Sequence, residues 1–180
     1  YDSMKLLKSI DLNILNKLIN IEKFKSKFHE LMTAYLCFNF INKEEEKKLS
    51  ELFKYLDRKN KMKLDIYDFK IAFKNAGIFV SLKQLKNIMN VLDSDENMTI
   101  EYQEFLRAMC DKDKLFCDRN LKTVFSNMDK YKKGLIDIKD IIRFISGKSN
   151  CNEEYKNEIL SQIDLKDNQK LNFEEFVELI

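Results

Sequence analysis

The sequence predicts an all-α protein of four similar helix-loop-helix units, grouped in two paired lobes and preceded by a long amphipathic helix. Proline is absent and only 3 of the 180 residues are glycine, so few residues interrupt helices. Apolar residues recur at helical spacing, as at Leu49, Leu52, Phe53 and Leu56. The third observation is a repeat of about 36 residues, which sets the number of units.

Residues 1–42 lie outside the repeat and are predicted to form one basic amphipathic helix. Apolar residues recur every three or four positions at Leu7, Ile10, Ile14, Leu18, Ile21, Phe24, Phe28, Leu31 and Tyr35. Lysines lie among them at Lys5, Lys8, Lys17, Lys23, Lys25 and Lys27. A helix of this kind fits a hydrophobic groove formed by other helices. An ordinary packed helix is the alternative, while a membrane-surface helix lacks a supporting tryptophan.

The repeat starts at aspartates that follow an apolar residue. They are Asp57, Asp93, Asp129 and Asp164, at spacings of 36, 36 and 35 residues. Seven residues after each aspartate stands an aliphatic residue, namely Leu64, Ile100, Ile136 and Leu171. Eleven residues after it stands an acid, namely Asp68, Glu104, Asp140 and Glu175, and the next residue is Phe69, Phe105, Ile141 or Phe176. Each unit therefore fits a helix, a twelve-residue loop and a second helix.

Helix start signals and strand contacts complete the predicted units. Asn42 with Glu45, and Ser81 with Gln84, have capping-box spacing. The aliphatic loop residues are expected to pair in short strands, Leu64 with Ile100 and Ile136 with Leu171. These pairs predict an N-terminal lobe of residues 43–112 and a C-terminal lobe of residues 113–180. The stretch "CDKDKLFCD" between them lacks glycine and proline, so we expect a helical or stiff connector.

The second loop has the complete set of oxygen donors for a hard cation. A twelve-residue calcium-binding loop supplies the oxygens that hold the ion from its positions 1, 3, 5, 7, 9 and 12. The corresponding donors are Asp93, Asp95, Asn97, the Thr99 carbonyl, Glu101 and Glu104. Met98 stands at position 6, where glycine is usual, and a left-handed backbone there costs about 1–2 kcal/mol. The sequence therefore predicts a calcium site in loop two, with all four loops being purely structural as the alternative.

The other three loops are degraded as calcium sites. Loop one has Lys59 and Lys61 at positions 3 and 5, and loop three has Tyr131 and Lys133 there. An ammonium repels a cation, so both loops are expected not to bind calcium. Loop four has Lys166 at position 3 and is only a weak candidate. Its possible ligands are Asp164, Asn168, Asn172 and Glu175.

These four units resemble EF-hands, and their pairing resembles calmodulin. The stretches "NILNKL", "KFKSKFHELM" and "EEEKKLSELFKYLD" are similar to the C-terminal regulatory region of calcium-dependent protein kinases of plants and apicomplexan parasites. The resemblance implies that the N-terminal segment is a junction helix that restrains an upstream serine/threonine kinase domain. It also implies that calcium makes the EF-hand lobes engage this helix. A calcium-independent, light-chain-like scaffold for a partner helix is the alternative.

Composition and missing motifs exclude several other functions. The chain has no glycine-rich phosphate loop, HRD-like catalytic loop or DFG, so we expect it not to be an enzyme by itself. A net charge of +2 gives no argument for nucleic acid as a partner, and the longest apolar stretch, residues 31–41, is too short to span a membrane. A single histidine and scattered cysteines argue against zinc and favour reduced thiols in a cytoplasmic protein. Because the chain begins at Tyr1, we expect it to be part of a longer protein.

Overall fold

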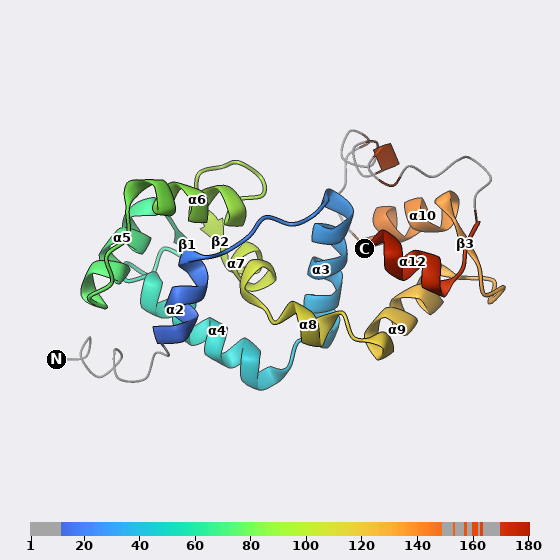
Figure 1. The fold of residues 1–180 in the computed structure, drawn as a ribbon, viewed down its shortest axis with the longest axis horizontal. Coiled ribbons are helices and arrows are strands. Elements are labelled where there is room, and N and C mark those ends of the chain that lie inside the picture. Colours follow the sequence, from blue (N-terminus) through green and yellow to red (C-terminus); the bar gives the residue numbers. More distant parts are fainter. Residues whose placement is uncertain (1–11, 149–152, 154–156, 158–159, 162, 164–169) are drawn as a thin grey trace. The chain divides into compact units, whose positions relative to one another are not determined.

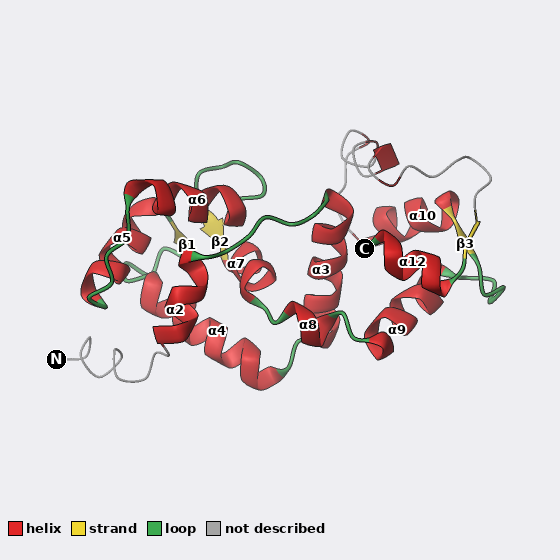
Figure 2. Cartoon of the chain, viewed as in Figure 1, coloured by secondary structure: helices red, strands yellow, loops and turns green. Residues whose placement is uncertain are grey.

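The computed structural model describes residues 12–148, 153, 157, 160–161, 163 and 170–180 (Figure 1). These residues are mostly helical, with two small two-stranded antiparallel sheets (Figure 2). The chain divides into two compact units. Unit one contains the described residues up to Lys23 together with Ile41–Asp111. Unit two contains Phe24–Phe40 and the described residues from Lys112 onward.

Unit one contains two complete helix-loop-helix units and one additional helix. Its helices are α2 (Leu12–Ile19), α4 (Lys43–Leu56), α5 (Ile66–Asn75), α6 (Leu82–Leu92) and α7 (Tyr102–Met109), and its strands are β1 (Lys63–Leu64) and β2 (Ile100–Glu101). The first unit of the repeat is α4–β1–α5 and the second is α6–β2–α7. Strands β1 and β2 are antiparallel and place Leu64 opposite Ile100, which confirms the predicted pairing.

Unit two contains the third helix-loop-helix unit and the end of the fourth. Its helices are α3 (Lys27–Phe40), α8 (Lys112–Leu115), α9 (Asp118–Met128), α10 (Ile138–Lys148) and α12 (Phe173–Leu179), and its strands are β3 (Ile136–Asp137) and β4 (Lys170–Leu171). Strands β3 and β4 place Ile136 opposite Leu171, as predicted. The short helix α8 lies in the stretch that was expected to be helical or stiff. Residues 164–169 of the fourth loop lie outside the described residues.

The apolar positions of the repeat form the cores of the two units. All of them are buried: Leu56, Leu64, Phe69, Leu92, Ile100, Phe105, Met128, Ile136, Ile141, Ile163, Leu171 and Phe176. In unit one the rings of Phe53 and Phe105 meet edge to face, with 5.4 Å between centroids. In unit two the rings of Phe125 and Phe176 are tilted by 57° to each other, with 5.6 Å between centroids. The 36-residue period therefore places the same three positions of each helix-loop-helix unit in a core.

The predicted helix starts are also found, one of them in altered form. Ser81 and Gln84 form a capping box at the start of α6. Asn42 caps α4, but its side chain accepts a hydrogen bond from the backbone N–H of Glu44 (2.8 Å), two residues on. Side-chain oxygens at these positions satisfy backbone donors that a helix leaves unpaired in its first turn.

The prediction of one long N-terminal helix is wrong for the described residues of this segment. The structure has two helices, α2 and α3, separated by residues 20–26. Asn20, whose side chain donates to the Asn16 carbonyl (3.4 Å), follows the end of α2. Ser26 caps α3, since its hydroxyl accepts a hydrogen bond from the His29 N–H (2.9 Å). Asn and Ser favour helix ends because their side chains bond to nearby backbone groups.

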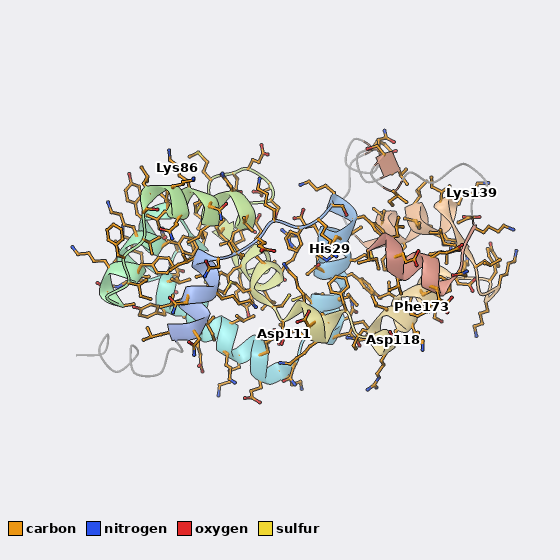
Figure 3. The ribbon with its side chains drawn as sticks, viewed as in Figure 1. His29, Lys86, Asp111, Asp118, Lys139 and Phe173 are labelled. Atoms are coloured by element: carbon orange, nitrogen blue, oxygen red, sulfur yellow. The ribbon has the colours of Figure 1, made fainter. Side chains whose placement is uncertain are left out.

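The two helices of this segment are packed in different units. In unit one, Leu15 and Leu18 of α2 are fully buried, and α2 packs against α6. In unit two, Phe28 and Met32 of α3 are buried, and α3 packs against α8. Figure 3 labels His29 on α3, where its ring stacks on Phe116 at 5.0 Å. The basic amphipathic pattern therefore supplies core residues to both units.

Candidate metal centre

Loop two connects α6 to α7 and is closed at its start by Asp93. This residue ends α6, with its backbone N–H bonded to the Met89 carbonyl. Its carboxylate accepts hydrogen bonds from the backbone N–H groups of Asn97 (3.1 Å, Oδ1) and Met98 (2.8 Å, Oδ2). The first loop residue thus folds the chain back on itself within five residues.

The three described loops share one backbone conformation despite different side chains. Position 6 is left-handed in each, with φ of 63° at Met62, 65° at Met98 and 70° at Gly134. Position 4 is left-handed too, at Asn60, Glu96 and Lys132, with φ of 52°, 56° and 52°. The loops with lysine in ligand positions therefore turn as loop two does. The left-handed residue that was expected at Met98 belongs to the fold of the loop.

Three of the predicted ligands of loop two converge. Asp93, Asp95 and Glu104 each offer a carboxylate oxygen, and these oxygens lie within 4.8 Å of one another. Glu104 is held in place by the backbone N–H groups of Ser94 (2.9 Å, Oε1) and Glu101 (3.0 Å, Oε2). Carboxylate oxygens gathered in this way are the ligands that calcium prefers.

The electrostatics of the cluster favour a cation. Burial raises the pKa of Asp93 above its ordinary value, and the adjacent carboxylate of Asp95 adds to this rise. The hydrogen bonds from Met98 and Asn97 act in the opposite direction but do not cancel the rise. Like charges at this separation repel each other, and a bound divalent cation offsets that repulsion.

The other predicted ligands of loop two are placed differently. The Asn97 side chain accepts from the Thr99 N–H (2.8 Å) and hydroxyl (2.6 Å), and its amide donates to Asp95 Oδ2 (2.8 Å). Glu101 precedes α7, and the convergent group of carboxylates does not include it. Position 9 of such loops often acts through a water molecule. The sequence analysis did not single out Arg107, which lies on α7 and donates a hydrogen bond from Nη2 to the Ser94 hydroxyl of loop two.

Loop one contains a lysine in the middle of its ligand positions. The ammonium of Lys61, at position 5, lies 2.7 Å from Asp65 Oδ2 and 2.7 Å from Asp68 Oδ2. The sequence predicted that lysine repels a metal ion here, but not that it binds the carboxylates at positions 9 and 12. The spacing of acids four and seven residues after a lysine was visible in the sequence, but it does not settle the contact, because Lys133, Asp137 and Asp140 of loop three have the same spacing and Lys133 lies over Tyr131 instead.

Loop three also has an internal partner for its closing acid. Arg143, on α10, donates from Nη2 to Asp140 Oδ1 (2.8 Å) and to the Met128 carbonyl (2.8 Å). Asp129 accepts from the N–H groups of Lys133 (3.0 Å) and Gly134 (2.7 Å), as Asp93 does from its loop. Loop three thus has the shared turn, with a guanidinium on the acid at position 12.

The weak candidate, loop four, is described only in part. Asn172 caps α12, which begins at Phe173 (Figure 3), and forms a capping box with Glu175. The Asn172 N–H donates to Glu175 Oε2 (2.8 Å), and the Glu175 N–H donates to Asn172 Oδ1 (3.0 Å). The remaining predicted ligands, Asp164 and Asn168, lie outside the described residues.

Comparisons with known proteins agree with this geometry. Residues 46–110, which carry loops one and two, match the EF-hand domain pair family. The chain is 26% identical over 140 residues to calcium-dependent protein kinase 7 of Oryza sativa subsp. japonica, an alignment that covers 78% of this chain and 26% of that protein. It is 26% identical over 169 residues to calcium-dependent protein kinase 2 of Zea mays, covering 94% of this chain and 33% of that protein.

A third similar protein is calcium-dependent protein kinase 4 of Plasmodium falciparum, which is 27% identical over 188 residues, covering 96% of this chain and 34% of that protein. The chain thus spans about a quarter to a third of the length of the curated relatives it matches. Residues 46–110 match an EF-hand pair, the chain as a whole is similar to calcium-dependent protein kinases, and calcium is the ion that these similarities indicate. Among the described residues, no helix has the length and apolar character to cross a bilayer.

Proposed function

We propose that this chain is the calcium-responsive regulatory part of a cytoplasmic serine/threonine protein kinase, and that it performs no catalysis itself. Loop two is the calcium site. Its ligands are the side chains of Asp93, Asp95, Asn97, Glu101 and Glu104 and the Thr99 carbonyl. The observation that carries the proposal is the convergence of the Asp93, Asp95 and Glu104 carboxylates within 4.8 Å, in a loop with the EF-hand turn.

The position of α2 supports a regulatory role for this site. Helix α2 packs against α6, which leads into loop two, and buries Leu15 and Leu18 completely. Lys17 donates from Nζ to the Met109 carbonyl (2.9 Å) and, more weakly, to the Cys110 carbonyl (3.4 Å) at the end of α7. An ammonium at a helix C-terminus is favourable because unpaired carbonyls and the helix dipole are negative there.

Helix α2 therefore contacts both helices that flank loop two. In sensor EF-hands, ion binding changes the angle between the two flanking helices. A change in the angle between α6 and α7 moves the Met109 carbonyl relative to the face of α6. Leu15, Leu18 and Lys17 then lose part of their present contacts, and α2 moves or exchanges its partners. In the longer protein, this segment is the link to the upstream kinase domain, which it restrains or releases.

Hydrogen exchange in α2, measured on the full 180-residue chain with and without calcium, tests this coupling. We expect calcium to change the exchange of residues 12–19 in the parent chain and not in a Glu104→Gln variant. Asp140→Asn, which alters the acid at the same position of loop three, is the matched control and should behave like the parent. Calcium binding that leaves exchange in α2 unchanged contradicts the coupling, although the site itself survives.

The second candidate is a calcium-independent scaffold, similar to a myosin light chain, that binds a partner helix. The observation in its favour is that the chain's own cations, Lys61 and Arg143, contact the closing acids of loops one and three. This function requires equal binding of an amphipathic helix in calcium and in chelator. A difference between the two conditions excludes it.

A further inference from the structure

We propose that the Lys61 ammonium is the resident cation of loop one, so that this loop and its strand β1 are closed without a metal ion. The inference concerns loop one alone and does not depend on calcium binding at loop two. The Lys61 side chain would then take the place of a metal ion in the first helix-loop-helix unit of unit one, and it cannot dissociate.

The ammonium lies where loop ligands meet. Lys61 stands at loop position 5, and its Nζ is 2.7 Å from the carboxylates at position 9, Asp65, and position 12, Asp68. Positions 5, 9 and 12 are ligand positions in calcium-binding loops. The Asp68 side chain is 6% exposed, whereas those of Lys61 and Asp65 are 27% and 36% exposed, so Asp68 is the member of the cluster that is shielded from water. A buried carboxylate is costly without a partner, and the ammonium is that partner.

The rest of loop one is closed in the same way as loop two. Asp57 accepts from the backbone N–H groups of Lys61 (2.8 Å) and Met62 (2.7 Å), as Asp93 does at the matching positions. Asp68 Oδ2 also accepts from the Asp65 N–H (2.8 Å), which links the end of the loop to the start of α5. A single oxygen of Asp68 therefore joins the backbone and the ammonium.

The ionisation of the two partners agrees with this arrangement. Hydrogen bonds from its ammonium to Asp65 and Asp68 raise the pKa of Lys61 above its ordinary value. Burial raises the pKa of Asp65, but the hydrogen bonds from Lys61 and the backbone outweigh it and leave the pKa below its ordinary value. The ammonium and the carboxylate are both charged at neutral pH, so the pair persists there.

Loop three lacks this device even though its closing acid has a cation. Loop three also has a lysine at position 5, Lys133, but its ammonium lies over the Tyr131 ring, 5.4 Å from the centroid, and not against the carboxylates of the loop. The closing acid Asp140 is paired instead with Arg143, three residues further along α10. Lys59, at position 3 of loop one, is exposed and provides a natural contrast within the same loop. Within loop one, Lys61 and not Lys59 contacts the carboxylates at positions 9 and 12.

The consequence is a fixed partner for loop two. Strand β1 pairs with β2, placing Leu64 opposite Ile100 and Lys63 opposite Glu101. Because loop one is held by its own ammonium, β1 remains available for pairing at any calcium concentration. Unit one then has one permanently closed loop and one loop whose state depends on the solution.

Hydrogen exchange of the full chain in excess EDTA tests the proposal, with the rate read from peptides that cover β1. We expect Lys61→Met to speed exchange at β1 by about tenfold or more, because it leaves two neighbouring carboxylates without the cation that neutralises them. Lys59→Met, the matched control in the same loop, should leave the rate unchanged. An equal rate in Lys61→Met and Lys59→Met overturns the proposal.

A double-mutant cycle separates the ion pair from a general loss of stability. Asp65→Asn retains an acceptable helix cap for α5 but removes one charge of the pair. We expect Asp65→Asn to speed exchange at β1 in the parent chain and to have no further effect in the Lys61→Met chain. Independent, multiplicative effects overturn the proposal. If Lys61→Met fails to fold, Asp65→Asn alone decides, since an unchanged rate at β1 contradicts the ion pair.

Discussion

Replacing Met98 by glycine should stabilise the fold of unit one and leave calcium affinity almost unchanged. The left-handed backbone at Met98, with φ of 65°, costs about 1–2 kcal/mol for a residue with a side chain. Glycine avoids this cost but loses about 0.5–1 kcal/mol through its greater freedom in the unfolded chain. The Met98 side chain is 79% exposed, so its removal forfeits little packing. The expected net gain is about 0.5–1 kcal/mol.

We expect the gain in the free energy of unfolding and not in calcium affinity, because loops with different residues at their ligand positions share the same turn. Met62 in loop one has φ of 63° beside Lys61, so the left-handed turn does not require a calcium ligand set. Met62→Gly is therefore the matched control, and it should give a similar gain. The Met62 side chain is also well exposed, at 72%.

Thermal unfolding and calorimetric calcium titration measure the two quantities. Each variant should raise the melting temperature of unit one by about 2–8 °C. Calcium affinity in Met98→Gly should change by less than about threefold, which is less than 1 kcal/mol. A tenfold gain in affinity without a gain in stability would mean that the turn forms on calcium binding and not on folding, which contradicts the expected result.

Three further outcomes are expected. Lys17→Met should speed hydrogen exchange in α2 because it removes the bond to the Met109 carbonyl, worth about 1 kcal/mol, and unchanged exchange contradicts this anchoring. Burial, Lys112 and Lys25 lower the pKa of His29 to about 4, so between pH 6.5 and pH 4 the unfolded chain binds more protons at this residue than the folded chain does. As the pH is lowered through this window, the unfolding free energy should therefore fall by about 1–2 kcal/mol, a value that allows for solvent screening. His29→Phe should abolish that part of the pH dependence. Burial and Asp95 raise the pKa of Asp93, so protons should compete with calcium at a higher pH than they would at an ordinary aspartate. The calcium affinities measured at pH 5 and pH 7 should therefore differ less in an Asp95→Asn variant than in the parent chain.

The repeat could be predicted from the sequence because burial imposes it. Leu64 and Ile100 must both reach a core and must also face each other across two short strands, so their matched loop positions determine the pairing. The convergence of Asp93, Asp95 and Glu104 was likewise predictable, since a shared loop fold carries these positions to one place. Both features were predictable because the repeat places equivalent residues at the same position of each loop.

Two features were not predictable from that period. The break between α2 and α3 is hidden because Ile21, Phe24 and Phe28 continue the helical spacing across it, while the local bonds of Asn20 and Ser26 end one helix and begin the next. The binding of Lys61 by its own loop depends on side-chain reach and burial, which spacing alone does not reveal. In both cases a local hydrogen bond or ion pair decides the structure.

Isothermal calorimetry of calcium binding to the full chain and to its Glu104→Gln variant shows whether loop two holds the ion. We expect binding heat in the parent chain, retention of that heat in Asp140→Asn, and its loss in Glu104→Gln, because Glu104 closes the carboxylate cluster of loop two. No heat from the parent chain at millimolar calcium, or undiminished heat from Glu104→Gln, would contradict the assignment of calcium to this loop.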